Sequence, residues 1–516
     1  MRKVFLVAII VVSACCGYAQ QVETSRFEVS RWSKKQGCHF EPFAEKGGMM
    51  VYETDKTDEK KNRIWNFVTL DTSLVEQHIQ PIPLPDKLKF FDSKSSSEWA
   101  AFVFLDEKAA RSDSIRYFVV TCHLPDTSFN TFSDKLPELA LLQSIALIDD
   151  NLTLSVNYRT GSGFLLQYDL SRNSHRHIPP HISNDFIIFQ FTALPEERVF
   201  VLAAREYVEK HYKATTFQVY SKDGYLLHSH RFENPENSVL GRMCFAFDDH
   251  HQLLVYATLE RESNKKVTVQ GMTEDFSKIV VGVVWIKFAS SGTLTRSFLF
   301  KDLPEIDQAL TASDRLRVKE ELLKMQKGKK QEKGEITFQF HMPRLVKFGD
   351  LQVFAAEAFQ PVFHTETRME HTYYGTYPVY YTVFDGYDFF SEILLAFDQD
   401  GMLRWYNSLR FENDLTEKLY AHATEAVCHD ELLVASPSHN TLRYEVFDAD
   451  GSRLLDQQVA PLDFLDGMDS FDDEYEAGIY QWYDDRFLIH GCQIVQNPRL
   501  RTPRRTVFYV QKIQYE

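Results

Sequence analysis

Residues 442–452 read Leu-Arg-Tyr-Glu-Val-Phe-Asp-Ala-Asp-Gly-Ser, an alternating apolar strand that runs into an Asp-Gly turn. Glycine accepts a positive φ without a Cβ clash, so Asp-Gly between alternating apolar residues is a strong signal of a β-hairpin. The pattern returns at 217–227 (Phe-Gln-Val-Tyr-Ser-Lys-Asp-Gly-Tyr-Leu-Leu) and at 393–403 (Ile-Leu-Leu-Ala-Phe-Asp-Gln-Asp-Gly-Met-Leu). We therefore expect a series of repeated antiparallel hairpins.

A second pattern precedes these hairpins in the compact units. It is an apolar strand, an acidic or glycine-containing turn and another apolar strand, as in Cys-His-Asp-Glu-Leu-Leu-Val at 428–434. Eight copies are marked by Gly47, Ser95, Asp150, Glu196, Asp249, Gly349, Asp430 and Asp485. Subtracting these residue numbers gives spacings of 46 to 55 residues, except for 100 before Gly349 and 81 before Asp430.

Each unit thus holds four antiparallel strands and cannot bury both of its faces alone. Radial packing of such sheets solves this problem, so the sequence predicts an all-β chain folded as a β-propeller with eight four-stranded blades. The last unit has only three strands, and residues 26–32 are expected to supply its fourth and close the ring. A seven-bladed propeller is the alternative, because the second copy of the strand–turn–strand pattern matches the others only loosely. A pair of β-sandwiches is a further alternative.

Three insertions account for the long units, near 259–279, 303–334 and 359–391. The middle one has the pattern of a helix, with Thr311 or Ser313 as its expected N-cap. A lysine-rich run follows this helix, at 324–333. Such a run is typical of a solvated connector, although it could also contact an anionic lipid or a partner.

The first residues resemble an export signal. Arg2 and Lys3 precede an uncharged apolar run at 4–14, too short to cross a bilayer and of the size of a signal-peptide core. We expect a signal peptide at 1–19, cleaved after Ala19, and a single mature domain at 20–516. Alternatively, 12–15 is a lipobox and Cys15 carries a lipid anchor. The predicted location is therefore the periplasm or the cell surface, with membrane contact only through Cys15.

One repeat, Phe397-Asp-Gln-Asp-Gly-Met-Leu-Arg-Trp405, is similar to those of quinoprotein-like propellers. That resemblance implies a tryptophan, here Trp405, docked between blades. The other units lack the tryptophan, so we expect no quinone and no other cofactor. No nucleophile elbow, P-loop or dinucleotide fingerprint occurs, which leaves any catalytic residues unknown. A net charge of −16 argues against nucleic-acid binding.

The 359–391 insertion is the candidate partner-binding segment, because eleven aromatic residues lie between Phe359 and Phe390. Tyrosine provides a large contact area with few rotamers to fix, so this composition favours contact with a protein, or stacking on a glycan. The candidate binding residues are Tyr373, Tyr374, Tyr377, Tyr380, Tyr381, Phe384 and Tyr387. The alternative is that these rings form a small core under an extended hairpin.

Two polar clusters are weaker candidates. The acidic stretch at 463–476 could hold calcium, but it does not fit the EF-hand pattern and is more typical of a solvated loop. Four arginines, Arg499, Arg501, Arg504 and Arg505, could pair with its acids. His175, His177 and His181 have near metal-ligand spacing but no cysteine or acidic partner, so we expect no metal there.

The sequence therefore favours a non-enzymatic, monomeric binding or scaffold protein of the bacterial cell envelope. The alternative is an exported carbohydrate-active hydrolase or lyase with its site at the mouth of the propeller channel. Carboxylates with perturbed pKa values in a deep central pocket would favour the enzyme. An aromatic patch far from the channel would favour the binding protein.

Overall fold

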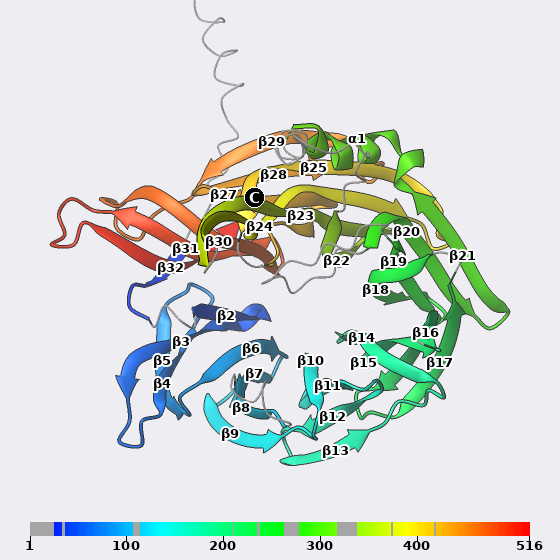
Figure 1. The fold of residues 1–516 in the computed structure, drawn as a ribbon, viewed down its shortest axis with the longest axis horizontal. Coiled ribbons are helices and arrows are strands. Elements are labelled where there is room, and N and C mark those ends of the chain that lie inside the picture. Colours follow the sequence, from blue (N-terminus) through cyan, green and yellow to red (C-terminus); the bar gives the residue numbers. More distant parts are fainter. Residues whose placement is uncertain are drawn as a thin grey trace, which may run out of the picture.

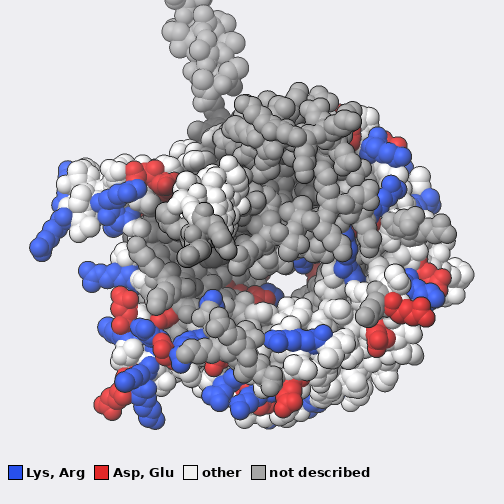
Figure 2. Space-filling model, in the orientation of Figure 1, with Lys and Arg blue, Asp and Glu red and all other residues white. Residues whose placement is uncertain are grey.

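The fold was analysed in a computed structural model that describes residues 25–32, 37–106, 114–209, 211–234, 238–262, 278–316, 338–372, 375–416 and 419–515. These residues form eight four-stranded antiparallel sheets, arranged in chain order around a central opening (Figure 1). The opening is also visible in the space-filling view (Figure 2). The expected eight-bladed β-propeller is thereby confirmed, and the seven-bladed and β-sandwich alternatives are wrong. Below, blades are numbered from 1 to 8 along the chain.

The first four blades have regular strands. Blade 1 contains β2 (Cys38–Phe43), β3 (Gly47–Thr57), β4 (Arg63–Leu70) and β5 (Glu76–Leu84), with η1 (Ala44–Lys46) in its first turn. Blade 2 contains β6 (Leu88–Ser95), β7 (Trp99–Asp106), β8 (Arg116–His123) and β9 (Ser128–Lys135). Blade 3 contains β10 (Ala140–Ile148), β11 (Asn151–Tyr158), β12 (Gly163–Asp169) and β13 (Ser174–Ile178). Blade 4 contains β14 (Asp185–Leu194), β15 (Val199–Val208), β16 (His211–Ser221) and β17 (Leu226–Glu233).

The second half of the ring carries the insertions. Blade 5 contains β18 (Val239–Phe247), β19 (Leu253–Glu262), β20 (Lys278–Ala289) and β21 (Gly292–Leu299). Blade 6 contains β22 (Gln339–Phe348), β23 (Leu351–Thr372), β24 (Gly375–Phe397) and β25 (Leu403–Thr416). Blade 7 contains β26 (Thr424–Cys428), β27 (Glu431–Ser438), β28 (Thr441–Phe447) and β29 (Arg453–Pro461). Blade 8 contains β30 (Ser470–Tyr483), β31 (Arg486–Gln496), β32 (Arg504–Gln514) and β1 (Ser25–Val29).

The core lies between the blades. Eight apolar clusters are buried, and each combines residues of two neighbouring blades, including blade 8 with blade 1. Each sheet therefore covers both of its faces with its neighbours, which the repeat pattern required.

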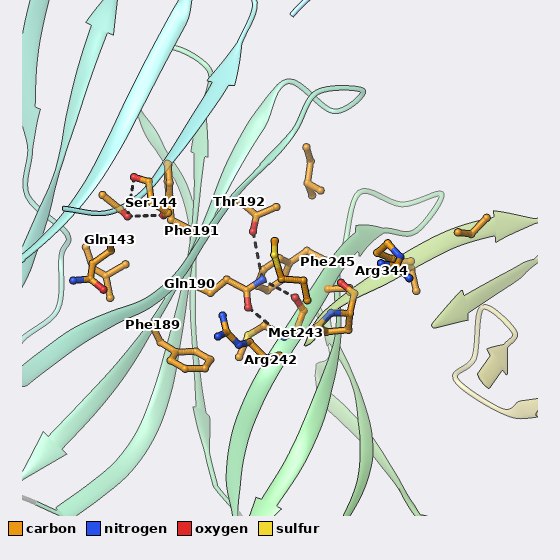
Figure 3. Close-up of a pocket in the computed structure, with 18 of the residues that line it drawn as sticks. Gln143, Ser144, Phe189, Gln190, Phe191, Thr192, Arg242, Met243, Phe245 and Arg344 are labelled. Carbon is orange, nitrogen blue, oxygen red and sulfur yellow. Dashed lines mark hydrogen bonds between the residues drawn. The ribbon is translucent and has the colours of Figure 1, made fainter. Parts of the chain in front are cut away.

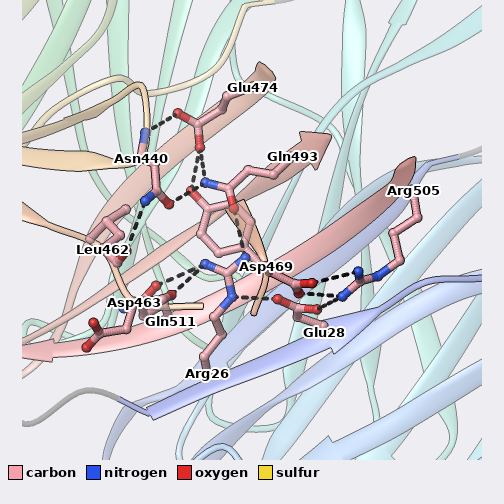
Figure 4. Close-up of polar contacts among 11 residues, drawn as sticks. Arg26, Glu28, Asn440, Leu462, Asp463, Asp469, Glu474, Gln493, Arg505 and Gln511 are labelled. Carbon is pink, nitrogen blue, oxygen red and sulfur yellow. Dashed lines mark hydrogen bonds and ion pairs between the residues drawn. The ribbon is translucent and has the colours of Figure 1, made fainter. Parts of the chain in front are cut away.

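The ring is closed by pairing of β1 with β32, from Ser25 opposite Lys512 to Val29 opposite Phe508. This confirms the predicted closure by the N-terminal strand. A polar network surrounds the joint (Figure 4). In it, Arg26 donates to Glu28 and Gln493, and Arg505 forms a bidentate pair with Asp469.

The Asp-Gly turns form as expected, with φ of 78° at Gly451. The ring of Trp405 lies against this glycine, and its indole N–H donates to the carbonyl of Ala449 at 3.0 Å. Trp405 therefore docks between blades 6 and 7, as the quinoprotein-like repeat implied. A Cβ on Gly451 would lie 2.5 Å from the Trp405 ring, so this position requires glycine for space as well as for its backbone conformation.

The insertions lie outside the regular sheets. A 3-10 turn, η3 (Phe300–Asp302), leads into α1 (Pro304–Leu316) between blades 5 and 6. The expected N-cap at Thr311 or Ser313 is wrong, because the helix begins at Pro304, whose fixed φ suits the first helical position. The lysine-rich run and most of the 259–279 insertion lie outside the described residues. The described part of the chain holds no helix long and apolar enough to span a bilayer.

Candidate functional site

The innermost strands of blades 3 to 6 share a β-bulge at one level of the ring. In β10, β14, β18 and β22 the pairing with the next strand shifts by one residue. In all four, regular pairing resumes four residues before the last pair, at Ser144, Gln190, Met243 and Arg344. A bulge interrupts the ladder and redirects side chains, and bulges are common beside functional sites.

The bulges line a central cavity of about 860 Å³ (Figure 3). Each bulge contributes a side chain to its wall, namely Gln143, Phe189, Arg242 and Met342. The inner strands β26 and β30 of blades 7 and 8 add Thr424, Glu425, Tyr480 and Gln481. A cavity of this size, lined by aromatic and aliphatic side chains with a few polar groups, has the character of a small-molecule site.

Side chains also connect neighbouring blades at this level. The Gln190 amide accepts from the backbone N–H of Met243 at 3.2 Å and donates to its carbonyl at 2.6 Å (Figure 3). Asn157 makes the same pair of bonds to the backbone of Ile188. These contacts imitate strand pairing across the gap between two sheets, so they hold the cavity wall in place.

Arg344 is the centre of a buried ionic cluster in this wall. It binds Glu425 of blade 7 through two N–H donors at 2.7 Å each. A third donor contacts Glu357 on β23 at 2.8 Å, and a fourth contacts Glu392 on β24 at 2.9 Å. The three carboxylates are 0 to 1 % exposed, whereas the Arg344 side chain is 25 % exposed. Arg344 is therefore the more exposed member of the cluster, and the three carboxylates are buried around it.

Three carboxylates around one guanidinium cannot all be ionised at low cost. Burial, followed by the nearby Glu425 carboxyl, raises the pKa of Glu392 well above its usual range. Arg344 acts against the same burial and lowers the pKa of Glu357 to about 2. Oxygen Oε2 of Glu392 is buried and accepts no hydrogen bond from the described residues, as expected of an oxygen that carries a proton. We therefore assign the proton to Glu392 and the negative charges to Glu357 and Glu425.

Two histidines lie beside the cluster. Burial lowers the pKa of His341 to about 4, so its ring is neutral at physiological pH. The ring of His422 stacks on Tyr420 and contacts Phe389, and its backbone N–H donates to Glu357 at 2.9 Å. Arg344 is therefore the cation that contacts both ionised glutamates.

The predicted aromatic site is divided by the structure. Residues 360–372 and 375–386 form the outer part of a long β23–β24 hairpin, which continues beyond the pairing of both strands with β22 and β25. Tyr377, Tyr380 and Tyr381 are 46, 69 and 37 % exposed on this hairpin. Tyr373 and Tyr374 lie outside the described residues.

The remaining two candidates are part of the packing. Tyr387 is 4 % exposed and belongs to the core between blades 6 and 7, so it lies away from the exposed part of the hairpin. Phe384 is half-buried against Tyr387 and Phe363. The alternative, a small aromatic core under the hairpin, therefore holds at the base of the segment but not at its exposed end.

The other polar candidates have structural partners. Asp469 pairs with Arg505 and Asp472 with Arg504, so the expected pairing of acids and arginines is confirmed at these two positions. His175 and His177 lie on β13 against Tyr168 and Phe164. Among the described residues no group of three or more histidine, cysteine or acidic side chains has a metal-binding arrangement. The five described cysteines are buried, and none of them forms a disulfide within the described part of the chain.

Fold and site together define a closed β-propeller with a central cavity lined by apolar and polar side chains. Solved structures similar to it include the β-propeller domain of the Trilobed protease from Pyrococcus furiosus, at 9 % identity and a TM-score of 0.34, over 84 % of this chain and 99 % of that one. Prolyl oligopeptidase B from Galerina marginata is 9 % identical, with a TM-score of 0.38 over 90 % of this chain and 56 % of that one. Dihydro-heme d1 dehydrogenase NirN is 12 % identical, with a TM-score of 0.34 over 85 % of this chain and 78 % of that one.

These likenesses concern the fold alone. The chain spans about half the length of prolyl oligopeptidase B. No protein-family description matches the sequence, and neither does any curated protein.

Proposed function

We propose that this chain is an exported binding protein of the bacterial cell envelope that contacts a protein partner through the outer β23–β24 hairpin. The observation that carries the proposal is the exposure of Tyr380 and Met369, at 69 and 60 %. Large apolar side chains gathered at such exposure on one element are typical of interaction surfaces.

The register of the hairpin separates its aromatics onto two faces. Thr367 lies opposite Tyr380, and Met369 lies opposite Pro378 two positions along. Side chains of neighbouring positions alternate between faces, whereas directly opposed residues share one. One face therefore carries Tyr380 and Met369 together, and the other face carries Tyr381. An isolated two-stranded ribbon with apolar groups on both faces gains stability when another surface covers it.

Tyr381 and Tyr377 share one face with each other. The Tyr381 hydroxyl donates to Glu370, and the guanidinium of Arg368 lies 5.4 Å from the Tyr381 ring centre. These contacts fix the ring before a partner arrives, which lowers the entropy cost of binding. A fixed aromatic surrounded by charged groups is common at the centre of protein interfaces.

Export is inferred from the sequence alone. It is supported by the basic residues at 2 and 3 and the apolar run at 4–14, which precede the described residues. The possible lipid anchor at Cys15 would hold the propeller at a membrane surface. Radiolabelled fatty acid incorporated into the full chain, and lost in Cys15→Ala, would support the anchor; cleavage after Ala19 found by N-terminal sequencing would exclude it.

The partner can be captured by photo-crosslinking in the native cells. A photoreactive phenylalanine replaces Tyr380, and the matched control replaces Tyr225, which is 67 % exposed in the turn between β16 and β17 of blade 4. The proposal predicts one dominant protein adduct from position 380 that is missing from position 225. Identical adducts from both positions, or a glycan adduct at 380 without protein, would contradict it.

A hydrolase remains the second candidate, because Glu425 lines the central cavity and two more carboxylates with shifted pKa values, Glu357 and Glu392, lie buried beside it. It ranks lower because these groups are 0 to 1 % exposed and their oxygens bind Arg344. A catalytic acid must reach the proton acceptor of its substrate. Hydrolysis of aryl glycosides by the purified protein, lost in Glu425→Gln with the fold retained, would move the function to the cavity.

A further inference from the structure

We infer that the central cavity is a binding site for a small organic anion with an apolar body, and that Arg344 anchors its acidic group. This inference is independent of the hairpin and of the partner proposed for it. It is carried by the cavity, by the construction of the Arg344 cluster and by the mixture of side chains in the wall.

The cluster is built to hold a guanidinium at the cavity surface. Arg344 has five N–H donors, and the hydrogen bonds within the described residues occupy four of them, one on Nε, one on Nη1 and two on Nη2. The second proton of Nη1 is not used by these carboxylates. Arg344 lines the cavity and a quarter of its side chain is exposed, and the bonds to three carboxylates fix the orientation of its guanidinium.

Stability alone does not account for this arrangement. Burying one cation with three acids has a large desolvation cost, and apolar residues of similar volume usually serve a core equally well or better. Blades 3 to 5 have Ser144, Gln190 and Met243 at the position that Arg344 occupies in blade 6. The ring therefore closes without an ionic cluster in three equivalent places, and the cluster is specific to blade 6.

The charges facing the cavity favour an anion. Its charged lining residues are Arg242, Arg344 and Glu425. Glu425 is 1 % exposed and both of its oxygens bind Arg344, and the two cations of the lining are Arg344 and Arg242. Glu392 carries a proton and His341 is neutral, which leaves the negative charge of Glu357 behind the guanidinium. A carboxylate, sulfonate or phosphate group matches an arginine edge of this kind.

The rest of the wall fits an apolar body. Phe189, Phe191, Phe245, Met243 and Leu345 line the cavity beside the polar groups. Met342 is 63 % exposed in the bulge two residues before Arg344. A ligand with one acidic group and an aromatic or aliphatic portion could satisfy both parts of the wall, and 860 Å³ lies within the usual range of ligand sites.

The test uses 8-anilinonaphthalene-1-sulfonate, a fluorescent organic anion, titrated into the full mature protein. Met342→Glu and Met342→Lys form a matched pair at an exposed position beside Arg344, so both should fold. We expect Met342→Glu to weaken binding about tenfold, as one added like charge near the ligand would. Met342→Lys should bind at least as tightly as the wild type. Equal affinities in the two variants would overturn the inference.

Two further variants locate the probe. Tyr380→Ser changes the exposed hairpin, and probe affinity should stay unchanged; a loss there would place the probe on the hairpin and overturn the inference. Arg344→Lys keeps the charge but loses the planar fork, so a folded variant should bind the probe about tenfold more weakly. An unchanged affinity in folded Arg344→Lys would also overturn the inference. If that variant does not fold, the Met342 pair decides.

Discussion

The buried carboxyl of Glu392 offers a sharp test of the charge arrangement around Arg344, because glutamine has the same shape and needs no proton. In Glu392→Gln the amide oxygen can accept from Arg344 as the carboxyl does now at 2.9 Å. The amide N–H₂ can replace the proton that Glu392 offers to Glu425. The substitution should therefore preserve the contacts of the cluster and remove only the need for protonation.

The magnitude follows from the direction of the pKa shift. Glu392 has an ordinary pKa of 4.5, and burial raises the pKa well above this value in the folded protein. Above pH 4.5 folding must therefore take up a proton, which costs the wild type about 1.4 kcal/mol per pH unit until the folded pKa is reached. At pH 7 this cost is at most about 3 kcal/mol. Glu392→Gln should avoid it and be more stable than the wild type at pH 7, but equally stable near pH 4.5.

The assay is urea unfolding at pH 5, 6, 7 and 8, with Glu425→Gln as the matched control. Glu425 is ionised and binds Arg344 through both oxygens, so its neutralisation should destabilise the fold by about 2–4 kcal/mol at pH 7. The reasoning is refuted if Glu392→Gln differs from the wild type by the same free energy at every pH. It is also refuted if the two variants lose equal stability at pH 7.

Three more predictions test the architecture. Gly451→Ala should lower the free energy of unfolding by about 2–4 kcal/mol, because the added Cβ would clash with the Trp405 ring and φ is 78°. The control Gly349→Ala has a φ of 57° and open space around the Cβ, so it should cost about 1 kcal/mol in thermal unfolding. Equal losses in the two variants would contradict the docking of Trp405. A variant lacking β1 leaves β32 as an open edge and should aggregate in light scattering, so a stable monomer would argue against closure by that strand. Burial raises the pKa of Cys122 to about 12, so this thiol should resist Ellman's reagent at pH 8 until urea is added, and rapid modification of the folded protein would contradict its burial.

The repeat and the closure of the ring could be predicted because they depend on short-range signals. Asp-Gly turns such as the one at Gly451 have a sequence signature that follows from backbone sterics. The missing strand of blade 8 was visible as an alternating segment at the opposite end of the chain. The helix start at Pro304 was missed because serine and threonine further along gave a stronger apparent cap than the proline at the true first turn.

The Arg344 cluster could not be predicted from spacing. Glu357, Glu392 and Glu425 are separated by 35 and 33 residues, and they meet because they lie on β23, β24 and β26. Each one, however, interrupts an apolar strand with a charge at a buried position, which is a recognisable signal. The bulges left a weaker trace in Gly241 and Pro343, residue types that often mark irregular strand pairing.

The hairpin and the Arg344 cluster share two strands. β23 carries Glu357 of the cluster and continues to Met369, and β24 returns from Tyr380 to Glu392. A ligand that draws Arg344 toward the cavity would weaken its bonds to both glutamates at once, and those glutamates lie at the root of the hairpin. Tyr387 and Phe389 pack between that root and blade 7, so they connect the cluster to the base of the exposed segment. If both proposed sites are real, occupation of the cavity and partner binding at the hairpin should influence each other to the same extent in both directions, because coupled equilibria are reciprocal.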